Sequence, residues 1–225
     1  MNVLLQIRSE LCEEHEREDI LRCILEGQKF IRNANIFRVH VSIRDIMRVI
    51  DLYHYFTFNS AGKSLLERGS KHWQALIISI AMGYYFRLSN NPTEKNNRND
   101  FAKMMNEILK ECGCRLTFVE TVKDAMLKLY NETIIPLGIA KTDALLENLF
   151  CTVICIDAKI PLIITGPAGS SKTLSFTIAA DNMKGKQSTT SLYKKMYHVH
   201  PFRYQCSEQV SCIEYKENLL IIAFY

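Results

Sequence analysis

The sequence predicts a mostly α-helical chain whose C-terminal part opens an α/β unit. Over about the first 130 residues, apolar side chains recur three or four positions apart, which is the spacing of amphipathic helices. Near residue 160, a short apolar run leads into a glycine-rich loop, and helical spacing resumes after that loop. A helical region, a linker and the start of an α/β unit are therefore expected, with the boundary near residue 135.

The N-terminal region is expected to be a series of helices. The first covers residues 3–32, and the second begins at Ser42, where Ser42 and Asp45 form a capping-box-like pair. The third, residues 71–88, is apolar nearly all round, so we expect it to be buried. Further helices are expected at 101–112, at 121–131 and from Thr142 to about Ala158.

Composition narrows the class of protein. A net charge of +4 is too small to argue for nucleic acid, and the eight cysteines include no C-x-x-C pair, so no zinc finger or RING is expected. The N-terminus lacks the pattern of a signal peptide. The apolar stretches 76–85 and 145–156 are shorter than the ~20 residues of a membrane span. We expect reduced thiols, a cytoplasmic location and no transmembrane segment.

The stretch 163–176, IITGPAGSSKTLSF, follows the phosphate-binding pattern G-x-x-x-x-G-K-[ST], with Ser171 in place of the last glycine. In such a loop, backbone N–H groups and a helix N-terminus bind phosphates. Lys172 would add charge at the β- and γ-phosphates, and the hydroxyl of Thr173 would be a Mg²⁺ ligand. The predicted cofactors are ATP and Mg²⁺, and the predicted binding residues are Gly166, Pro167, Ala168, Gly169, Ser170, Ser171, Lys172 and Thr173.

Ser171 is the departure from the pattern. Its Cβ crowds the loop, but is tolerated if the local φ is negative. The alternative is a Gly/Ser-rich turn that binds nothing, with a serine as helix cap. The expected strand at Ile160–Ile164, the Gly-Pro start of the loop and the Lys-Thr pair favour the nucleotide site.

A complete hydrolysis site is not expected. A P-loop ATPase needs an acid at the end of a second apolar strand to hold Mg²⁺ and orient water. A second strand is expected at 202–206, but the later apolar run, 219–225, contains no Asp or Glu.

The segment 184–204 is basic and aromatic. Such a segment can bind single-stranded nucleic acid, but a solvated helix face is the interpretation we favour, so no nucleic-acid partner is expected. His198 and His200 could ligate a metal, but no Cys or acid lies near them in sequence, so we interpret them as surface residues.

Several motifs between about residues 35 and 207 resemble the mysterin family of giant RING-finger AAA+ E3 ubiquitin ligases. These motifs are Val41–Ile46 with Arg48, Tyr53-x-Tyr55-Phe56, Ala144-Leu145-x-Glu147–Phe150, Cys155–Ile156, Ile160–Leu162, the loop Gly166–Lys172, and Gln205–Ser207. The Gly-Ser-Ser-Lys form of the loop is similar to one of that family's tandem AAA modules, in which serine replaces the last glycine. The resemblance implies that Ser171 belongs to the family's pattern.

The resemblance implies a domain order. Residues 1–133 would be the helical lid and connector of one AAA+ module, and residues 134–225 an incomplete P-loop subdomain of the next. Arg44, at the start of a lid helix, would be a candidate sensor of the γ-phosphate of a bound nucleotide. The residues that bind this nucleotide would lie upstream of Met1 in a longer protein. The alternative for Arg44 is a surface or capping-region arginine. The implied partners are ATP and the neighbouring AAA modules.

After about Ser207 the chain departs from the family, so we interpret it as a fragment or truncated form. It lacks the catalytic acid and the RING. The resemblance therefore implies that any contact with the ubiquitin machinery would be made by regions of the family that this sequence does not contain. On its own the chain is expected to be inactive. One alternative is a helical protein-interaction module with a vestigial loop. A small stand-alone P-loop kinase fits poorly, because too little chain follows residue 160.

Overall fold

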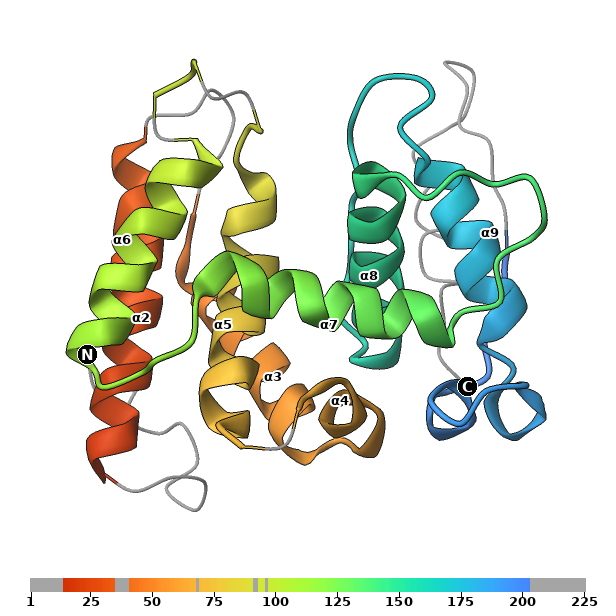
Figure 1. Ribbon diagram of the computed structural model, residues 1–225, viewed down its shortest axis with the longest axis horizontal. Helices are drawn as coiled ribbons and strands as arrows, with labels where there is room; N and C mark the ends of the chain where they lie inside the picture. The colour runs from red at the N-terminus through yellow and green to blue at the C-terminus, as the bar shows by residue number, and fades with distance from the viewer. Residues whose placement is uncertain (1–13, 35–40, 68, 91–92, 96, 203–225) are drawn as a thin grey trace, which may run out of the picture. The chain divides into compact units, whose positions relative to one another are not determined.

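The computed structural model describes residues 14–34, 41–67, 69–90, 93–95 and 97–202. These residues form helices joined by loops (Figure 1). Within the described part of the chain there is no β-strand, only an isolated antiparallel bridge between Lys184 and His198. The prediction of a mostly helical chain is confirmed.

The helices follow the predicted order, with the addition of α4 (Ser60–Leu65), which was not predicted. The α-helices are α2 (Glu14–Asn33), α3 (Ile43–Phe58), α4 (Ser60–Leu65), α5 (Lys71–Gly83), α6 (Arg98–Glu111), α7 (Phe118–Glu132), α8 (Asp143–Asp157) and α9 (Lys172–Asn182). The described part of the chain also has three short 3-10 helices: η1 (Tyr85–Arg87), η2 (Gly185–Gln187) and η3 (Tyr193–Lys195). The expected third helix is therefore shorter than predicted, because it ends at Gly83 and a 3-10 turn follows.

The chain divides into two compact units. One groups residues 1–59 with 66–125, and the other groups residues 60–65 with 126–225. The helix α7 supplies residues to both. The predicted domain boundary after residue 133 was placed by resemblance to the modules of the mysterin family, whereas these units are defined by compactness. The boundary between modules therefore stays a prediction.

The helix α5 lies in the core of the first unit. Its residues 74–81 are buried, as expected for a helix that is apolar nearly all round. The helix α3 packs along α5, and a Cβ added at Gly83 would clash with the side chain of Val49. The close approach of the two helices therefore requires glycine at position 83.

The predicted capping pair at the start of α3 is present. The backbone N–H of Ser42 donates to Oδ2 of Asp45 at 2.7 Å, and the Ser42 hydroxyl donates to the same oxygen at 3.1 Å. The helix begins at Ile43, directly after Ser42. A local sequence signal therefore determined this helix start.

The second unit is held together by helix packing and by side-chain hydrogen bonds. The helices α8 and α9 pack against each other (Figure 1). At the C-terminal end of α9, the Asn182 amide donates to the carbonyl oxygen of Ile134 at 3.0 Å and accepts from the Ile134 N–H at 2.9 Å. The hydroxyls of Thr133 and Tyr193 share a buried hydrogen bond of 2.7 Å. These bonds attach the end of α7 to the segment that follows α9.

The predicted strand at Ile160–Ile164 is not formed. These residues have no regular structure, and the side chains of Leu162 and Ile163 are 40% and 88% exposed. A strand needs a neighbour to pair its N–H and C=O groups, and no described residue supplies one. The second expected strand, 202–206, lies outside the described residues except for Phe202, and so does the run 219–225.

Candidate functional site

The predicted nucleotide-binding residues form one loop and the first turn of a helix. The loop runs from Gly166 to Ser171, and α9 begins at Lys172. Gly169 has a φ of 79°, in the left-handed region that favours glycine. The loop residues are mostly exposed, and so is Thr173 on the first turn of α9.

Ser171 is in a left-handed conformation, with φ 60° and ψ 17°. The condition under which a Cβ is tolerated there, a negative φ, is therefore not met. A left-handed backbone costs a residue with a Cβ roughly 1 kcal/mol or more, and this cost is absent for glycine. The backbone at position 171 is thus the one that the last glycine of the phosphate-binding pattern would adopt without strain.

Lys172 closes the loop on itself. Its Nζ donates to the carbonyl oxygens of Gly166 at 2.8 Å and Pro167 at 2.6 Å, and to Oγ of Ser170 at 3.1 Å. The Ser170 hydroxyl in turn donates to the carbonyl oxygen of Pro167 at 2.8 Å. The ammonium group is thus held by the first residues of the loop, at the beginning of α9.

Asn148, on α8, is a contributor that sequence reasoning did not assign to the site. Its Nδ2 donates to the backbone carbonyl oxygen of Ser170 at 2.7 Å. The helix α8 begins at the predicted place, where Oγ1 of the N-cap Thr142 accepts from the N–H of Leu145 at 3.2 Å. The one sequence signal for Asn148 is its place in the motif that resembles mysterin.

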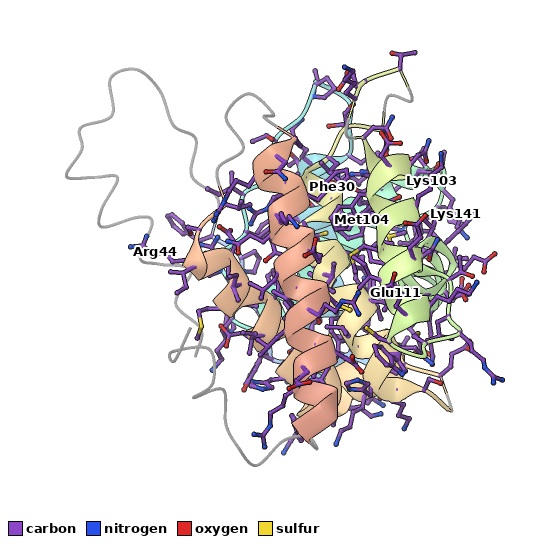
Figure 2. The ribbon with its side chains drawn as sticks, turned by 90° about the vertical axis from the view of Figure 1, so that its left-hand side faces the viewer. Phe30, Arg44, Lys103, Met104, Glu111 and Lys141 are labelled. Carbon is purple, nitrogen blue, oxygen red and sulfur yellow. The ribbon has the colours of Figure 1, made fainter. Side chains whose placement is uncertain are left out.

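Arg44 belongs to the other compact unit. It lies in the first turn of α3, where its side chain is exposed and extends away from the helix (Figure 2). It makes no hydrogen bond or ion pair with another residue in the described part of the chain. The arginines that pair with neighbouring Asp45 are Arg87, at 2.7 Å, and Arg48, at 3.5 Å. The sensor role of Arg44 stays a prediction.

The carboxylate of Asp45 is held by several donors in the first unit. Burial acts to raise the pKa of Asp45, but the hydrogen bonds from the Ser42 backbone and from Arg87 outweigh burial, and the pKa is lowered. The carboxylate therefore stays ionised and connects the start of α3 to η1.

The structure adds little to the weaker sequence candidates. Among the described residues, no group of three or more His, Cys, Asp or Glu side chains could hold a metal ion. The rings of His198 and His200 stack at 4.4 Å on the surface. The basic segment is not the helix face that we expected, because its described part consists of η2, η3 and irregular backbone.

No disulfide joins the cysteines among the described residues. Cys23, Cys112, Cys114, Cys151 and Cys155 are all free. As for membranes, none of the described helices combines the length and the apolar character that crossing a bilayer requires.

Known proteins resemble this chain over most of its length. Residues 138–218, which include the loop, match the family described as the RNF213 AAA domain. A Dictyostelium discoideum protein named as an uncharacterized transmembrane protein is 36% identical over 89% of this chain. The E3 ubiquitin-protein ligase RNF213 of Homo sapiens is 29% identical over 87%, and rnf213-beta of Danio rerio is 28% identical over 85%.

The chain spans about 4% of the length of each of these relatives. The relatives are E3 ubiquitin-protein ligases and the matched domain is an AAA domain, in agreement with the family that the sequence motifs resemble. The matched domain, the shared length and the motifs at the loop and at α8 together support an RNF213-like family for this chain.

Proposed function

We propose that residues 166–173 bind ATP with Mg²⁺ as the P-loop of an AAA+ module. The observation that supports this most is the closed loop, in which Lys172 reaches back to Gly166 and Pro167. A turn that only caps a helix would not need a lysine held at the start of that helix. The match of residues 138–218 to an AAA domain makes a nucleotide the natural ligand.

The residues present fit a nucleotide phosphate. The first N–H groups of α9 have no partner within the helix, and they and the helix dipole favour an anion at that end. The ammonium of Lys172 would lie beside that anion, and the exposed hydroxyl of Thr173 would ligate Mg²⁺. Magnesium would neutralise charge on the phosphates, and the backbone and Lys172 would hold them in place.

The proposed role is to hold nucleotide. The sequence places no Asp or Glu after a second apolar strand, which is where a P-loop ATPase carries the acid that orients water for hydrolysis. In a longer protein of this family, the exposed run at residues 160–164 would be the strand of the α/β subdomain, and the state of the nucleotide would bias the packing of neighbouring modules. Ubiquitin transfer and a cytoplasmic location would be properties of such a protein, to which this chain contributes the AAA part.

Nucleotide-dependent stabilisation tests the proposal. We expect Mg²⁺–ATP at ~100 times its dissociation constant to stabilise the chain by about 2.7 kcal/mol in thermal or urea unfolding. Lys172→Ala should abolish most of this effect. Lys186→Ala, which removes an exposed lysine of η2, is the matched control and should retain it.

The rival function is a helical interaction module with a vestigial loop. It predicts no stabilisation by ATP in the wild-type chain or in either variant. Equal stabilisation of wild type and Lys172→Ala would also count against the proposed site, because it would place the nucleotide elsewhere.

A further inference from the structure

The thiols of Cys23 and Cys112 meet in the first compact unit, far along the chain from the P-loop. Cys23 lies on α2 and is 0% exposed, and Cys112 follows the last residue of α6 and is half-buried. Each thiol affects the pKa of the other, and Asp19, one turn before Cys23 on α2, raises the pKa of Cys112. The two thiols and the carboxylate are therefore neighbours at the end of α6.

Other contacts between α2 and α6 hold this arrangement. The residues just before the two cysteines, Arg22 and Glu111, form an ion pair, and Glu111 lies near the end of α6 (Figure 2). Farther along the same two helices, the rings of Phe30 and Phe101 meet edge to face at 5.3 Å. The helices pack side by side and run antiparallel, so the meeting of the two thiols is a consequence of helix packing.

We propose that Cys23 and Cys112 form a site of reversible oxidation, at which a peroxide produces an intramolecular disulfide. Cys112 is the more exposed thiol and reacts first: its sulfur attacks one oxygen of hydrogen peroxide, the O–O bond breaks, and a sulfenic acid and water form. The sulfur of Cys23 then attacks the sulfur of Cys112, and the hydroxyl group leaves with the Cys23 proton as water. Two thiols lose two electrons and two protons, and the peroxide is reduced to two molecules of water.

The surroundings set the rate of this reaction. The carboxylate of Asp19 is placed to receive the proton of Cys112 when its sulfur becomes the nucleophile. Burial raises the pKa of both thiols, and for Cys112 the hydrogen bond and charge of Asp19 raise it further. Because the thiolate is the reactive form, oxidation is slow at neutral pH and needs sustained exposure to peroxide.

The disulfide would connect two positions that are 112 − 23 = 89 residues apart. A bond that closes so long a loop restricts the unfolded chain strongly and stabilises the folded unit. It would fix α2 to the end of α6 and prevent the two from separating. We expect Tm to rise by roughly 5 to 10 °C, and a thiol reductant to reverse the rise.

Peptide mapping of the oxidised chain tests the site. The chain is treated with hydrogen peroxide, free thiols are alkylated, and trypsin is added without reductant. Trypsin releases Cys23 in residues 23–29, CILEGQK, but releases Cys112 and Cys114 together in residues 111–115, ECGCR. The Cys114→Ser variant therefore assigns the bond: we expect 23–29 joined to 111–115 with the loss of two hydrogen atoms.

Cys112→Ser should remove both the joined peptide and the rise in Tm, and its half-buried position makes it a tolerable substitution. Cys151→Ser, at a half-buried site on α8, is the control and should keep both. The proposal is overturned if oxidised Cys114→Ser yields residues 23–29 only in alkylated form. It is also overturned if Cys112→Ser still gains stability on oxidation.

Discussion

Nζ of Lys172, the first residue of α9, lies 2.6 Å from the carbonyl oxygen of Pro167, five residues earlier in the preceding loop. The bond joins the end of the loop to its beginning, directly before the first turn of α9. The loop is therefore closed by its own lysine, and its shape depends on side chains as well as on glycine. The predictions that follow concern this loop, the helix that supports it and the charged contact at the start of α3.

Replacing Ser171 by glycine should stabilise the chain. The φ of 60° at Ser171 is strained for a residue with a Cβ, and glycine removes that strain, although it adds freedom to the unfolded chain. We expect a net gain of about 0.5 kcal/mol in the free energy of unfolding, measured with urea. Ser170→Gly is the control: it removes the hydroxyl bonded to Pro167 and Lys172 and should give no gain. Destabilisation by Ser171→Gly would show that the serine side chain contributes more than its backbone strain.

Removing the Asn148 side chain should loosen the loop. Asn148→Ala deletes the 2.7 Å hydrogen bond to the carbonyl oxygen of Ser170, a loss of about 1 kcal/mol. We expect faster amide hydrogen exchange in residues 166–171 and, if ATP binds there, a several-fold weaker affinity for it. Asn131→Ala, on the exposed face of α7, should change neither quantity. Unchanged exchange in the Asn148 variant would mean that Lys172 alone keeps the loop closed.

Asp45 should make stability depend on pH. Its pKa is lower in the folded chain than the ~3.9 of an unfolded aspartate, so its contribution is present above that value and is lost as the pH falls through the folded pKa. Asp45→Asn should cost about 1–3 kcal/mol at pH 7. In urea unfolding between pH 7 and pH 3, it should also flatten the acid decline in stability.

The matched control for Asp45 is Asp51→Asn, an exposed carboxylate two turns later on α3. It should change stability little at any pH. An equal acid decline in wild type and Asp45→Asn would assign the pH dependence to other carboxylates.

The crossing of α3 and α5 should reject a side chain at Gly83. Gly83→Ala places a methyl group against Val49 and should cost about 1–3 kcal/mol. Val49→Ala removes the clashing methyl groups, so the double variant should be more stable than the sum of the single changes predicts. Circular dichroism during thermal unfolding measures all three variants, and strict additivity would show that the two positions do not touch.

Local signals in the sequence predicted much of what is observed. The start of α3 at Ser42 and of α8 at Thr142 follow from caps that act over three residues, and the buried α5 follows from its apolar character all round. The position of the glycine-rich loop before α9 was also predicted from the sequence. Its role in binding nucleotide stays a prediction.

Contacts between distant residues could not be predicted in this way. Asp45 pairs with Arg87, which lies 42 positions away, and not with its neighbour Arg44. Asn148 reaches Ser170 only because α8 and α9 pack together. The strand predicted at Ile160–Ile164 failed for the same reason, since strand pairing depends on a partner and not on the apolar run itself.

The sequence by itself thus determined most of the helices, the caps at Ser42 and Thr142 and the place of the loop, because caps, periodicity and glycine act between residues close in the chain. The tertiary structure alone decided the left-handed backbone at Ser171, the closure of the loop by Lys172 and the meeting of Cys23 with Cys112. These features depend on which surfaces pack together. Packing brings together residues that are far apart in the chain, and no local sequence pattern predicts which of them meet.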